Sequence, residues 1–369
     1  MGISDKRSVI FYAPIGSTIK GYKNGGAEAG CRKTMAVLQS AGYKIILIEK
    51  PARKSFSKLG GLMFIFTLLS VWIKSVSIFL RNKHSVFHVA GFYLNQIYFE
   101  NLLIKTAKFI GIKTIYEIRN GGMIEAYNEG GSRYKKFMLS TLKNADLVLC
   151  QGLDYVTFIQ DHLNKPSVYY PNYILDKYIS GSNPVRRFDQ IQLVYFGRVV
   201  PDKNVDFIIE VCNELNIKKM PFHLDIIGGY EPSYHEQLTQ RIKYYNLDNA
   251  RIKFHGRMDF DMIYTYLKQA HFFVFPSKEK REGHSNSLTE AMGAGLVPVV
   301  STAGFNESIV GESNLVVKEF DAKLYAKVIS DVWESGQWQN YSDMVYHRVI
   351  NNFTEDIVKH SLLNAYQNI

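Results

Sequence analysis

Residues 275–300 read FPSKEKREGHSNSLTEAMGAGLVPVV, and this stretch is the most informative about the fold of the second half of the chain. An apolar strand ends at Phe275, a polar loop follows, and a helix is predicted to begin near Ser285–Ser287. That helix stops at Gly293–Gly295, just before the next apolar strand. A strand, a loop, a helix and a strand in this order are typical of a parallel α/β sheet.

The same loop has the composition of a ligand site. Gly283, Ser285 and Ser287 stand at the predicted helix start, where free N–H groups and the positive end of the helix dipole suit a phosphate. Glu282 precedes the helix, and Glu290 lies eight positions further on. Both can face a crevice at the carboxyl edge of the sheet, where open α/β folds bind ligands. Their carboxylates would accept hydrogen bonds from sugar and ribose hydroxyls, although a single glutamate alone would be read as a surface residue.

A second motif occupies residues 193–215, LVYFGRVVPDKNVDFIIEVCNEL. A strand is followed by Arg198, a proline-containing loop, Lys203 and a helix with an inward apolar face. The two cations could clamp a diphosphate, the arginine as a planar fork and the lysine as a point charge. The alternative is a pair of solvated loop cations.

Twelve short β-rich runs alternate with helical patterns and predict two parallel sheets, that is, two Rossmann-like domains of the α/β class. The predicted strands are 8–13, 44–48, 86–89, 113–118, 146–150, 167–170, 191–196, 222–227, 251–254, 272–275, 297–300 and 314–317. The segment 171–190, with its prolines and Gly-Ser-Asn cluster, is the predicted boundary. We expect domains at 1–180 and 190–352 and a terminal helix at 353–369.

The net charge of the 369 residues is +10, and it is unevenly placed. Residues 1–180 hold 24 Lys and Arg against 11 Asp and Glu, whereas residues 181–369 hold 20 against 23. The basic half indicates an anionic membrane, a nucleic acid or only a solvated face. No zinc knuckle, RNP aromatic set or Arg-rich helix is present, so we expect no nucleic acid. The three cysteines are far apart and form no CxxC, which favours reduced thiols in the cytoplasm.

One segment bears on the membrane interpretation. Lys50, Arg53, Lys54 and Lys58 precede an uncharged apolar run that begins at residue 59 and meets Lys74 before it is long enough to cross a bilayer. Residues 59–80 are therefore either a buried core helix or a helix lying in the membrane interface.

Four motifs together resemble the retaining glycosyltransferases of family four, of the bacterial surface-polysaccharide type. They are GRVVPDKN (197–204), IIGGY (226–230), KFHGR (253–257) and the stretch 282–300, in which Glu282 and Glu290 match the family's E-x7-E pattern. The resemblance implies the GT-B fold, with two Rossmann-like domains facing each other across a cleft and a C-terminal helix crossing back to the first. It also implies transfer of a sugar from a nucleotide-sugar donor in the second domain to a saccharide acceptor in the first.

The resemblance implies a role for each matching residue. Arg198 and Lys203 would hold the donor diphosphate, Glu282 the transferred sugar and Glu290 the ribose. The remaining donor-binding residues that it implies are Gly25, Gly26, Gly228, Arg257, Gly283, His284, Ser285, Asn286, Ser287 and Leu288. A UDP- or GDP-linked donor and no metal are expected, since arginine and lysine stand where other transferases use a divalent ion.

One departure concerns the acceptor side. Many family members carry a histidine after the strand 113–118, where this chain has Glu117, Arg119 and Asn120 instead. These three are acceptor-side candidates, and no general base is assigned to any of them. His88 is the nearest histidine, and in an apolar strand it is read as a satisfied core residue.

The other expectations concern partners and place. The acceptor is expected to be lipid-linked, for instance through polyprenyl diphosphate, and the protein cytoplasmic and peripheral on the inner face of the cell membrane. The sequence Asp259-Phe260-Asp261 spells DxD, but its place before a helix favours capping over metal binding. The absent histidine keeps a second function open, a catalytically silent GT-B-like protein that binds a nucleotide sugar or serves as a partner subunit.

Overall fold

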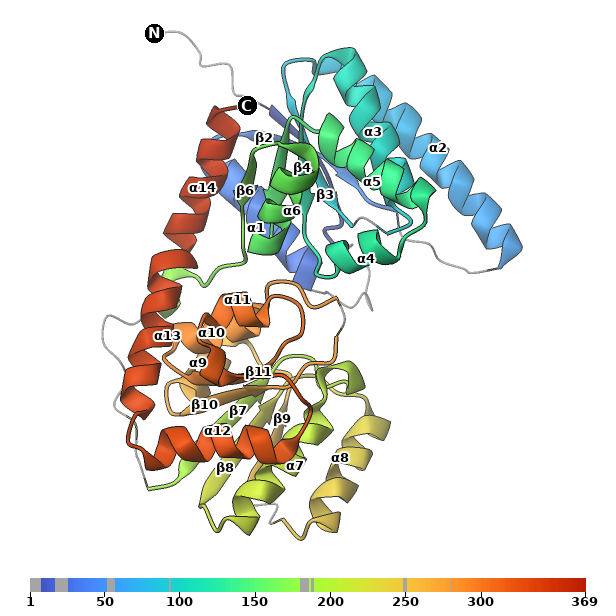
Figure 1. Cartoon of the computed structure of the whole chain (residues 1–369). Coiled ribbons are helices and arrows are strands. Elements are labelled where there is room, and N and C mark those ends of the chain that lie inside the picture. Colours follow the sequence, from blue (N-terminus) through green and yellow to red (C-terminus); the bar gives the residue numbers. More distant parts are fainter. Residues whose placement is uncertain are drawn as a thin grey trace. The chain divides into compact units, whose positions relative to one another are not determined.

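The computed structural model describes residues 8–16, 26–51, 57–92, 94–179, 186, 189–247, 251–279 and 281–369. The chain divides into two compact units. Unit 1 comprises Met1–Pro171 with Lys359–Ile369, and unit 2 comprises Asn172–Val358. Each unit contains one six-stranded parallel sheet flanked by helices (Figure 1). The predicted α/β class is confirmed.

Unit 1 has the strand order β2-β1-β3-β4-β5-β6. Its strands are β1 Ser8–Ala13, β2 Lys44–Glu49, β3 Val86–Gly91, β4 Lys113–Ile118, β5 Leu147–Cys150 and β6 Ser167–Tyr169. Its helices are α1 Gly26–Ser40, α2 Lys58–Arg81, α3 Ile97–Ile110, α4 Met123–Glu129, α5 Ser132–Asn144 and α6 Leu153–Leu163.

Unit 2 has the strand order β12-β11-β10-β7-β8-β9. Its strands are β7 Ile191–Phe196, β8 Phe222–Ile227, β9 Ile252–Gly256, β10 Phe272–Phe275, β11 Val297–Ser301 and β12 Val316–Val317. Its α-helices are α7 Val205–Ile217, α8 Pro232–Tyr244, α9 Phe260–Leu267, α10 Asn286–Gly293, α11 Asn306–Val310, α12 Ala322–Glu334 and α13 Trp338–Asn352. Three short 3-10 helices are η1 Asp176–Tyr178, η2 Pro201–Lys203 and η3 Ser313–Leu315.

The central strands of both sheets are buried on both faces. In β10 all four residues are buried, and in β1 only the first residue is partly accessible. This is why they read as continuous apolar runs, and why the strands predicted at 8–13, 191–196 and 272–275 agree with the structure to the residue.

The segment after Pro171 packs onto unit 2. Tyr178 donates a hydrogen bond to Asp261 at 2.6 Å, and the buried Arg186 donates to the carbonyls of Ala270 and Ala294 at 2.5 and 2.6 Å. The described part of the predicted boundary segment is therefore built into the second unit.

The chain ends in helix α14, Glu355–Gln367. From Lys359 onward it belongs to unit 1. Tyr366 lies inside unit 1, where its hydroxyl pairs with Nδ1 of His88 at 2.7 Å. A short C-terminal segment thus completes the packing of the N-terminal sheet.

The segment predicted at 59–80 is helix α2, and it is not a core helix. Only 11% of its most apolar window is buried. Lys50, which the sequence grouped with the cations before this helix, is buried instead and pairs with Glu100. Arg53 and Lys54 lie outside the described residues. The core interpretation of 59–80 is wrong, and so is the placement of Lys50 in an exposed cationic cluster.

Candidate active site

The candidate site lies at the carboxyl edge of the unit 2 sheet, where β7 and β10 are neighbours. From β7 the chain continues to β8 on one side, and from β10 it continues to β11 on the other. Such a reversal of strand order opens a crevice beyond the strand ends. The loops after the two strands meet there, since the amide of Lys278 donates to the carbonyl of Asp202 at 2.8 Å.

Lys203 and Glu282 form an ion pair at this edge. Their side chains are only 10% and 11% exposed, and the lysine ammonium also lies 5.5 Å from the ring centre of Phe275. Ser277 donates a second hydrogen bond to the same carboxylate oxygen at 2.8 Å. Residues 79 positions apart are thus joined. The pair places a poorly hydrated cation beside a fixed hydrogen-bond acceptor, which a diphosphate and a sugar hydroxyl require.

Arg198 does not share this enclosure. Its side chain is 64% exposed, and its guanidinium lies 3.9 Å from Glu279, the nearest carboxylate to which it is paired. The loop backbone is held in place because Tyr195 donates from its hydroxyl to the Arg198 carbonyl at 2.6 Å. A diphosphate at this edge would therefore meet one exposed cation, Arg198, and one enclosed cation, Lys203.

The helix predicted near Ser285–Ser287 is confirmed as α10. Ser285 is its N-cap and accepts a hydrogen bond from the Leu288 amide, and its hydroxyl lies 3.1 Å from that of Ser287. Gly283 precedes this cap, and Asn286 is the first helical residue. The N–H groups of a first turn have no partner within the helix, so the predicted phosphate cradle has the required backbone.

His284 contributes only its backbone to this loop. Its ring is 3% exposed, packs edge-on against Phe353 at 4.9 Å and lies 3.4 Å from the Thr289 hydroxyl. Burial lowers the pKa of His284 to about 3, so the ring is neutral at pH 7. Its carbonyl accepts a hydrogen bond from Asn172 at 2.6 Å. Glu290, the other carboxylate of the motif, is half-buried in the second turn of α10.

Close backbone approach explains two glycines. Gly228 follows β8 with φ of +154°, and a Cβ there would lie 1.7 Å from the Gly197 carbonyl oxygen. Gly304 has φ of +55°, and a Cβ would lie 1.9 Å from the Glu282 carbonyl oxygen. Our sequence reasoning missed Gly304, whose signal is a glycine three residues after strand β11. The missing side chain at Gly304 lets the loop after β11 pack directly against the backbone of Glu282.

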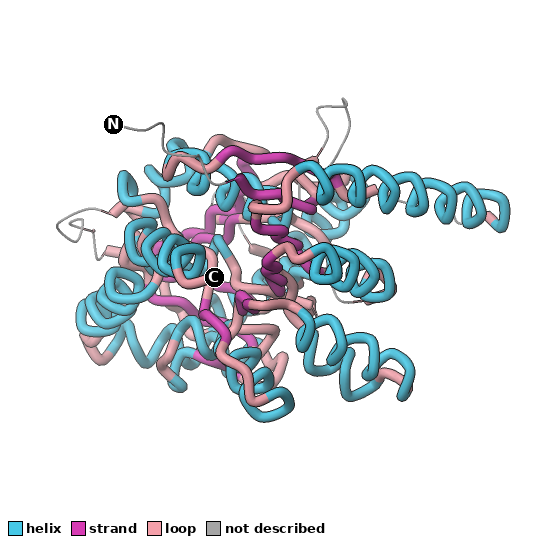
Figure 2. Tube along the Cα trace, turned by 90° about the horizontal axis from the view of Figure 1, so that it is seen from above, coloured by secondary structure: helices cyan, strands magenta, loops and turns pink. Residues whose placement is uncertain are grey.

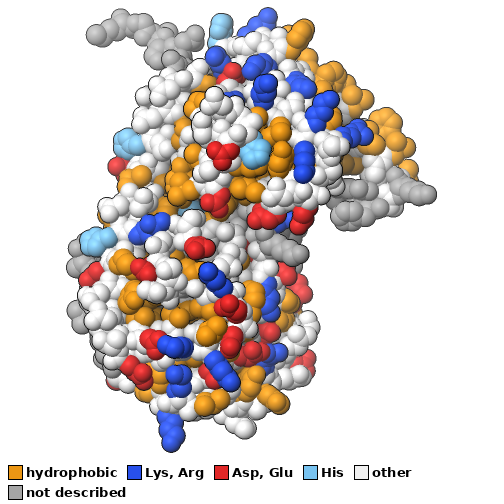
Figure 3. Space-filling view, in the orientation of Figure 1, with side chains coloured by type: hydrophobic (Ala, Val, Ile, Leu, Met, Phe, Trp, Pro, Cys, Tyr) orange, Lys and Arg blue, Asp and Glu red, His pale blue; other side chains and the backbone are white. Residues whose placement is uncertain are grey.

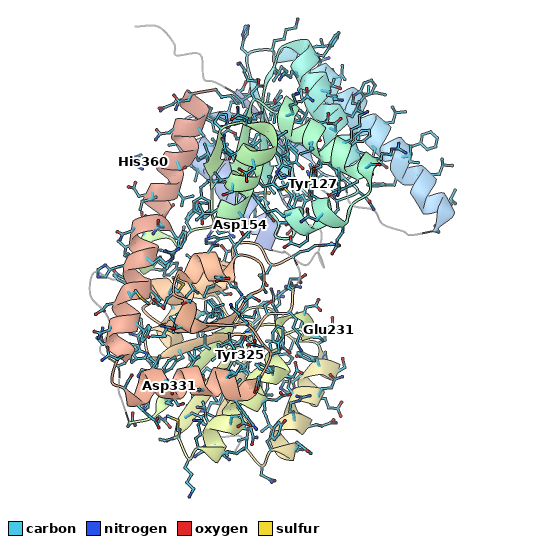
Figure 4. All side chains as sticks on the ribbon, viewed as in Figure 1. Tyr127, Asp154, Glu231, Tyr325, Asp331 and His360 are labelled. Carbon is cyan, nitrogen blue, oxygen red and sulfur yellow. The ribbon has the colours of Figure 1, made fainter. Side chains whose placement is uncertain are left out.

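The loop after β8 completes the edge. It runs from Gly228 to Glu231, the N-cap residue of α8 (Figure 4). Arg257 follows β9 and is exposed, and a Cβ on Gly229 would lie 3.5 Å from its guanidinium. Gly228 and Arg257 therefore lie on adjacent loops.

The acceptor-side candidates belong to unit 1, and the two charged ones are interior. Glu117 and Arg119 are 2% and 6% exposed and pair at 2.6 Å, and the same glutamate lies 3.1 Å from His88. Arg119 also donates to Thr34 at 2.5 Å. Burial raises the pKa of Glu117, but the Arg119 charge and the His88 hydrogen bond outweigh it, and the pKa is lowered. His88 is a buried core residue, as the sequence predicted, and its Nδ1 pairs with the Tyr366 hydroxyl.

Three further predictions are placed as follows. Asn120 is half-buried, and its carbonyl accepts the Tyr155 hydroxyl at 2.8 Å. Gly25 lies outside the described residues, and Gly26 is the first residue of α1. Asp259 stands at the N-cap position of α9, but its side chain makes no capping hydrogen bond. Among the residues that the structure describes, no group of three His, Cys, Asp or Glu side chains could hold a metal ion.

The second half of the chain matches a described protein family. Residues 190–335 match the family described as glycosyl transferases group 1, and this range contains the paired Lys203 and Glu282. No curated protein matches the sequence. The second half of the chain is therefore similar to the glycosyl transferases group 1.

Solved structures resemble the whole chain. A glycosyltransferase from Rickettsia africae aligns with a TM-score of 0.75 and 14% identity over 99% of both chains. HepE from Anabaena, in complex with UDP, aligns with a TM-score of 0.73 and 14% identity over 98% of this chain and 100% of that one. Sucrose-phosphate synthase from Thermosynechococcus elongatus aligns with a TM-score of 0.72 and 16% identity over 98% and 99%. The fold of the protein is GT-B.

Proposed function

We propose that this protein is a retaining glycosyltransferase that moves a sugar from a nucleotide-sugar donor to a saccharide acceptor. One observation carries the proposal: the buried Lys203–Glu282 pair at the switch point of a group 1 domain. The pair joins two motifs that both end at the carboxyl edge of the sheet, where open α/β folds bind ligands.

The donor would occupy the loops after β7 and β10. Lys203, assisted by the exposed Arg198, would neutralise the diphosphate as the sugar departs. Glu282 would accept a hydrogen bond from the sugar, and the α10 N-terminus behind Ser285 would hold the distal phosphate. Glu290 would bind the ribose. The two cations would supply the positive charge, and we propose that no metal is needed.

Catalysis would rest on positioning and electrostatic stabilisation. The acceptor would attack the face of the sugar that the nucleotide leaves, and a donor phosphate oxygen would take the acceptor proton. Such a mechanism needs no separate protein base. It is therefore compatible with a buried, charge-paired Glu117 in the place of the family's histidine.

We place the acceptor on unit 1 and propose that it is a lipid-linked saccharide, such as one on polyprenyl diphosphate, used in surface-polysaccharide assembly. The excess of Lys and Arg in residues 1–180 suits an anionic diphosphate carrier. We also propose a cytoplasmic location, since Cys31, Cys150 and Cys212 are free thiols.

The test is nucleotide binding without metal. UDP, GDP and ADP are compared by the thermal shift that each produces, and UDP-glucose, which is bound in one HepE structure, is the first sugar donor to try. A ligand at 100 times its Kd stabilises the fold by about 2.7 kcal/mol. We expect UDP or GDP to raise the Tm and Glu290→Ala to abolish the rise. Glu236→Ala, which removes an exposed glutamate on α8, is the matched control and should respond as wild type.

Turnover separates the enzyme from the catalytically silent alternative. An enzyme releases free nucleotide from its sugar donor when an acceptor is present, and Lys203→Ala should abolish that release. Binding of the donor without release, across a panel of lipid-linked and free saccharide acceptors, would favour the silent nucleotide-sugar-binding protein. No nucleotide response at all would refute the donor site.

A further inference from the structure

Helix α2 is much longer than the strands that it connects. Its 24 residues span about 36 Å, whereas a six-residue strand such as β2 spans about 20 Å. One side packs on unit 1, with Ser75 and Phe79 buried and Trp72 donating to Thr106 of α3 at 3.2 Å. The helix projects well beyond the elements around it (Figure 2).

The opposite side of α2 is apolar and exposed. We call the α2 face the following large side chains, each 49–69% exposed: Leu59, Leu62, Met63, Ile65, Phe66, Leu69, Ile73 and Leu80. Most of them recur at spacings of three and four and so share one side of the helix. Leu102 and Phe109 of the neighbouring α3 are 44% and 92% exposed. A soluble monomer rarely leaves such a continuous apolar surface uncovered.

The surroundings of the α2 face are cationic. Residues 57–92 contain four Lys and Arg and no Asp or Glu. Of these, Lys74 and Arg81 are exposed on α2 itself. Lys105 of α3 is also exposed, between Leu102 and Phe109. Figure 3 shows apolar and basic side chains interspersed over this part of unit 1. An apolar strip bordered by cations is complementary to a bilayer with anionic headgroups.

Two alternatives fit less well. A second copy of the chain would bring the same cations together across a two-fold axis, where they would repel. A transmembrane orientation meets the length and composition test, but α2 connects β2 to β3, and both strands pair with β1 in one sheet. Both helix ends are therefore tied to a folded unit, so they cannot stand on opposite sides of a hydrocarbon core of about 30 Å.

We propose that the α2 face, together with Leu102 and Phe109, lies flat in the interface of an anionic lipid bilayer and anchors unit 1 there. The apolar side chains insert at the boundary between headgroups and acyl chains, while Lys74, Arg81 and Lys105 contact the headgroups. This anchoring does not depend on the donor site. It would hold a lipid-linked acceptor and the enzyme on one surface.

The experiment is sedimentation of the full-length protein with lipid vesicles. One set of vesicles is phosphatidylcholine alone, and the other contains about 30 mol% of the anionic lipid phosphatidylglycerol, so that the comparison isolates the contribution of lipid charge. Wild type should bind the anionic vesicles, and added salt should weaken binding. The double variant Leu62→Ser/Phe66→Ser should bind at least about tenfold more weakly. Lys74→Ala should cost about fivefold, equivalent to about 1 kcal/mol for one cation near the surface.

Matched controls make the outcome interpretable. Ile217→Ser removes an apolar side chain that is 63% exposed on α7 of unit 2, and it should bind vesicles as wild type does. Nucleotide thermal shifts of the α2 variants should stay unchanged, which separates failure of the anchor from failure of the donor site. Wild type that stays in the supernatant with anionic vesicles overturns the proposal. So does a concentration-dependent dimer in sedimentation velocity that the double variant abolishes, because the occupant would then be a second copy.

Discussion

Replacing Lys203 by alanine tests the donor site and its energetics together. The change leaves the Glu282 carboxylate 11% exposed with Ser277 as its remaining hydrogen-bond donor. Breaking a fully buried ion pair by removing one partner costs about 3–5 kcal/mol. Because both side chains keep some exposure and one hydrogen bond survives, we expect about 2–3 kcal/mol, at or below the lower end of that range.

The expected loss of unfolding free energy can be expressed as a decrease in the Tm of unit 2. For a domain of 150–250 residues, 1 kcal/mol corresponds to about 2–4 °C. The transition of unit 2 in differential scanning calorimetry should therefore fall by about 4–12 °C. Lys203→Ala/Glu282→Gln should recover part of the loss, because the second change removes the unpaired charge.

The same variants separate structure from donor binding. Neither Lys203→Ala nor the double variant should respond to the nucleotide that stabilises wild type, since the fixed cation is gone in both. Lys203→Ala with a melting temperature within about 1 °C of wild type would show that the pair is not buried as described. An unchanged nucleotide response would refute the role of Lys203 at the diphosphate.

Three further outcomes are expected. Gly228→Ala should lower the Tm of unit 2 and weaken nucleotide binding, because the new Cβ meets the Gly197 carbonyl oxygen. The control is Gly336→Ala, which has a positive φ and open space around it, so that it measures only the free-energy cost of placing alanine in that backbone conformation. The depressed pKa of His284 makes stability fall as the pH drops from 6.5 towards about 3, because only the unfolded state takes up the proton. Urea titrations should show a slope of about 1.4 kcal/mol per pH unit from this group, and His284→Gln should remove it. Tyr366→Phe should destabilise unit 1 by about 1 kcal/mol through loss of the buried hydrogen bond to His88, seen as a lower midpoint in urea with an unchanged m-value.

Local patterns predicted the elements well. The strands predicted at 113–118 and 222–227 agree with β4 and β8 to the residue. At β12 the prediction of 314–317 began two residues early, because Ser313–Leu315 forms a 3-10 turn that the apolar residues of the run do not reveal. The start of α10 was predictable because a serine cap is a local interaction.

The sequence predicted which loops form the candidate site, but it did not predict which of their side chains pair with one another. The motifs around Arg198 and Glu282 placed both loops at one sheet edge. In the structure Lys203 is enclosed with Glu282, whereas Arg198 is exposed. This difference depends on how the loops after β7 and β10 pack. Likewise, the resemblance made Glu117 and Arg119 acceptor-side candidates, but only the structure shows that the two side chains are paired with each other and buried.

Periodicity, caps and spacing along the chain are enough to predict the element order, the two-sheet organisation and the residues of the candidate donor motif. Which side of α2 is covered depends on packing, since an apolar helix has the same periodicity in a core and at an interface. The tertiary structure also decided that Lys50 is neutralised by Glu100 rather than facing outward. Contacts between residues that are distant in sequence depend on strand order and helix packing, which local propensities do not encode.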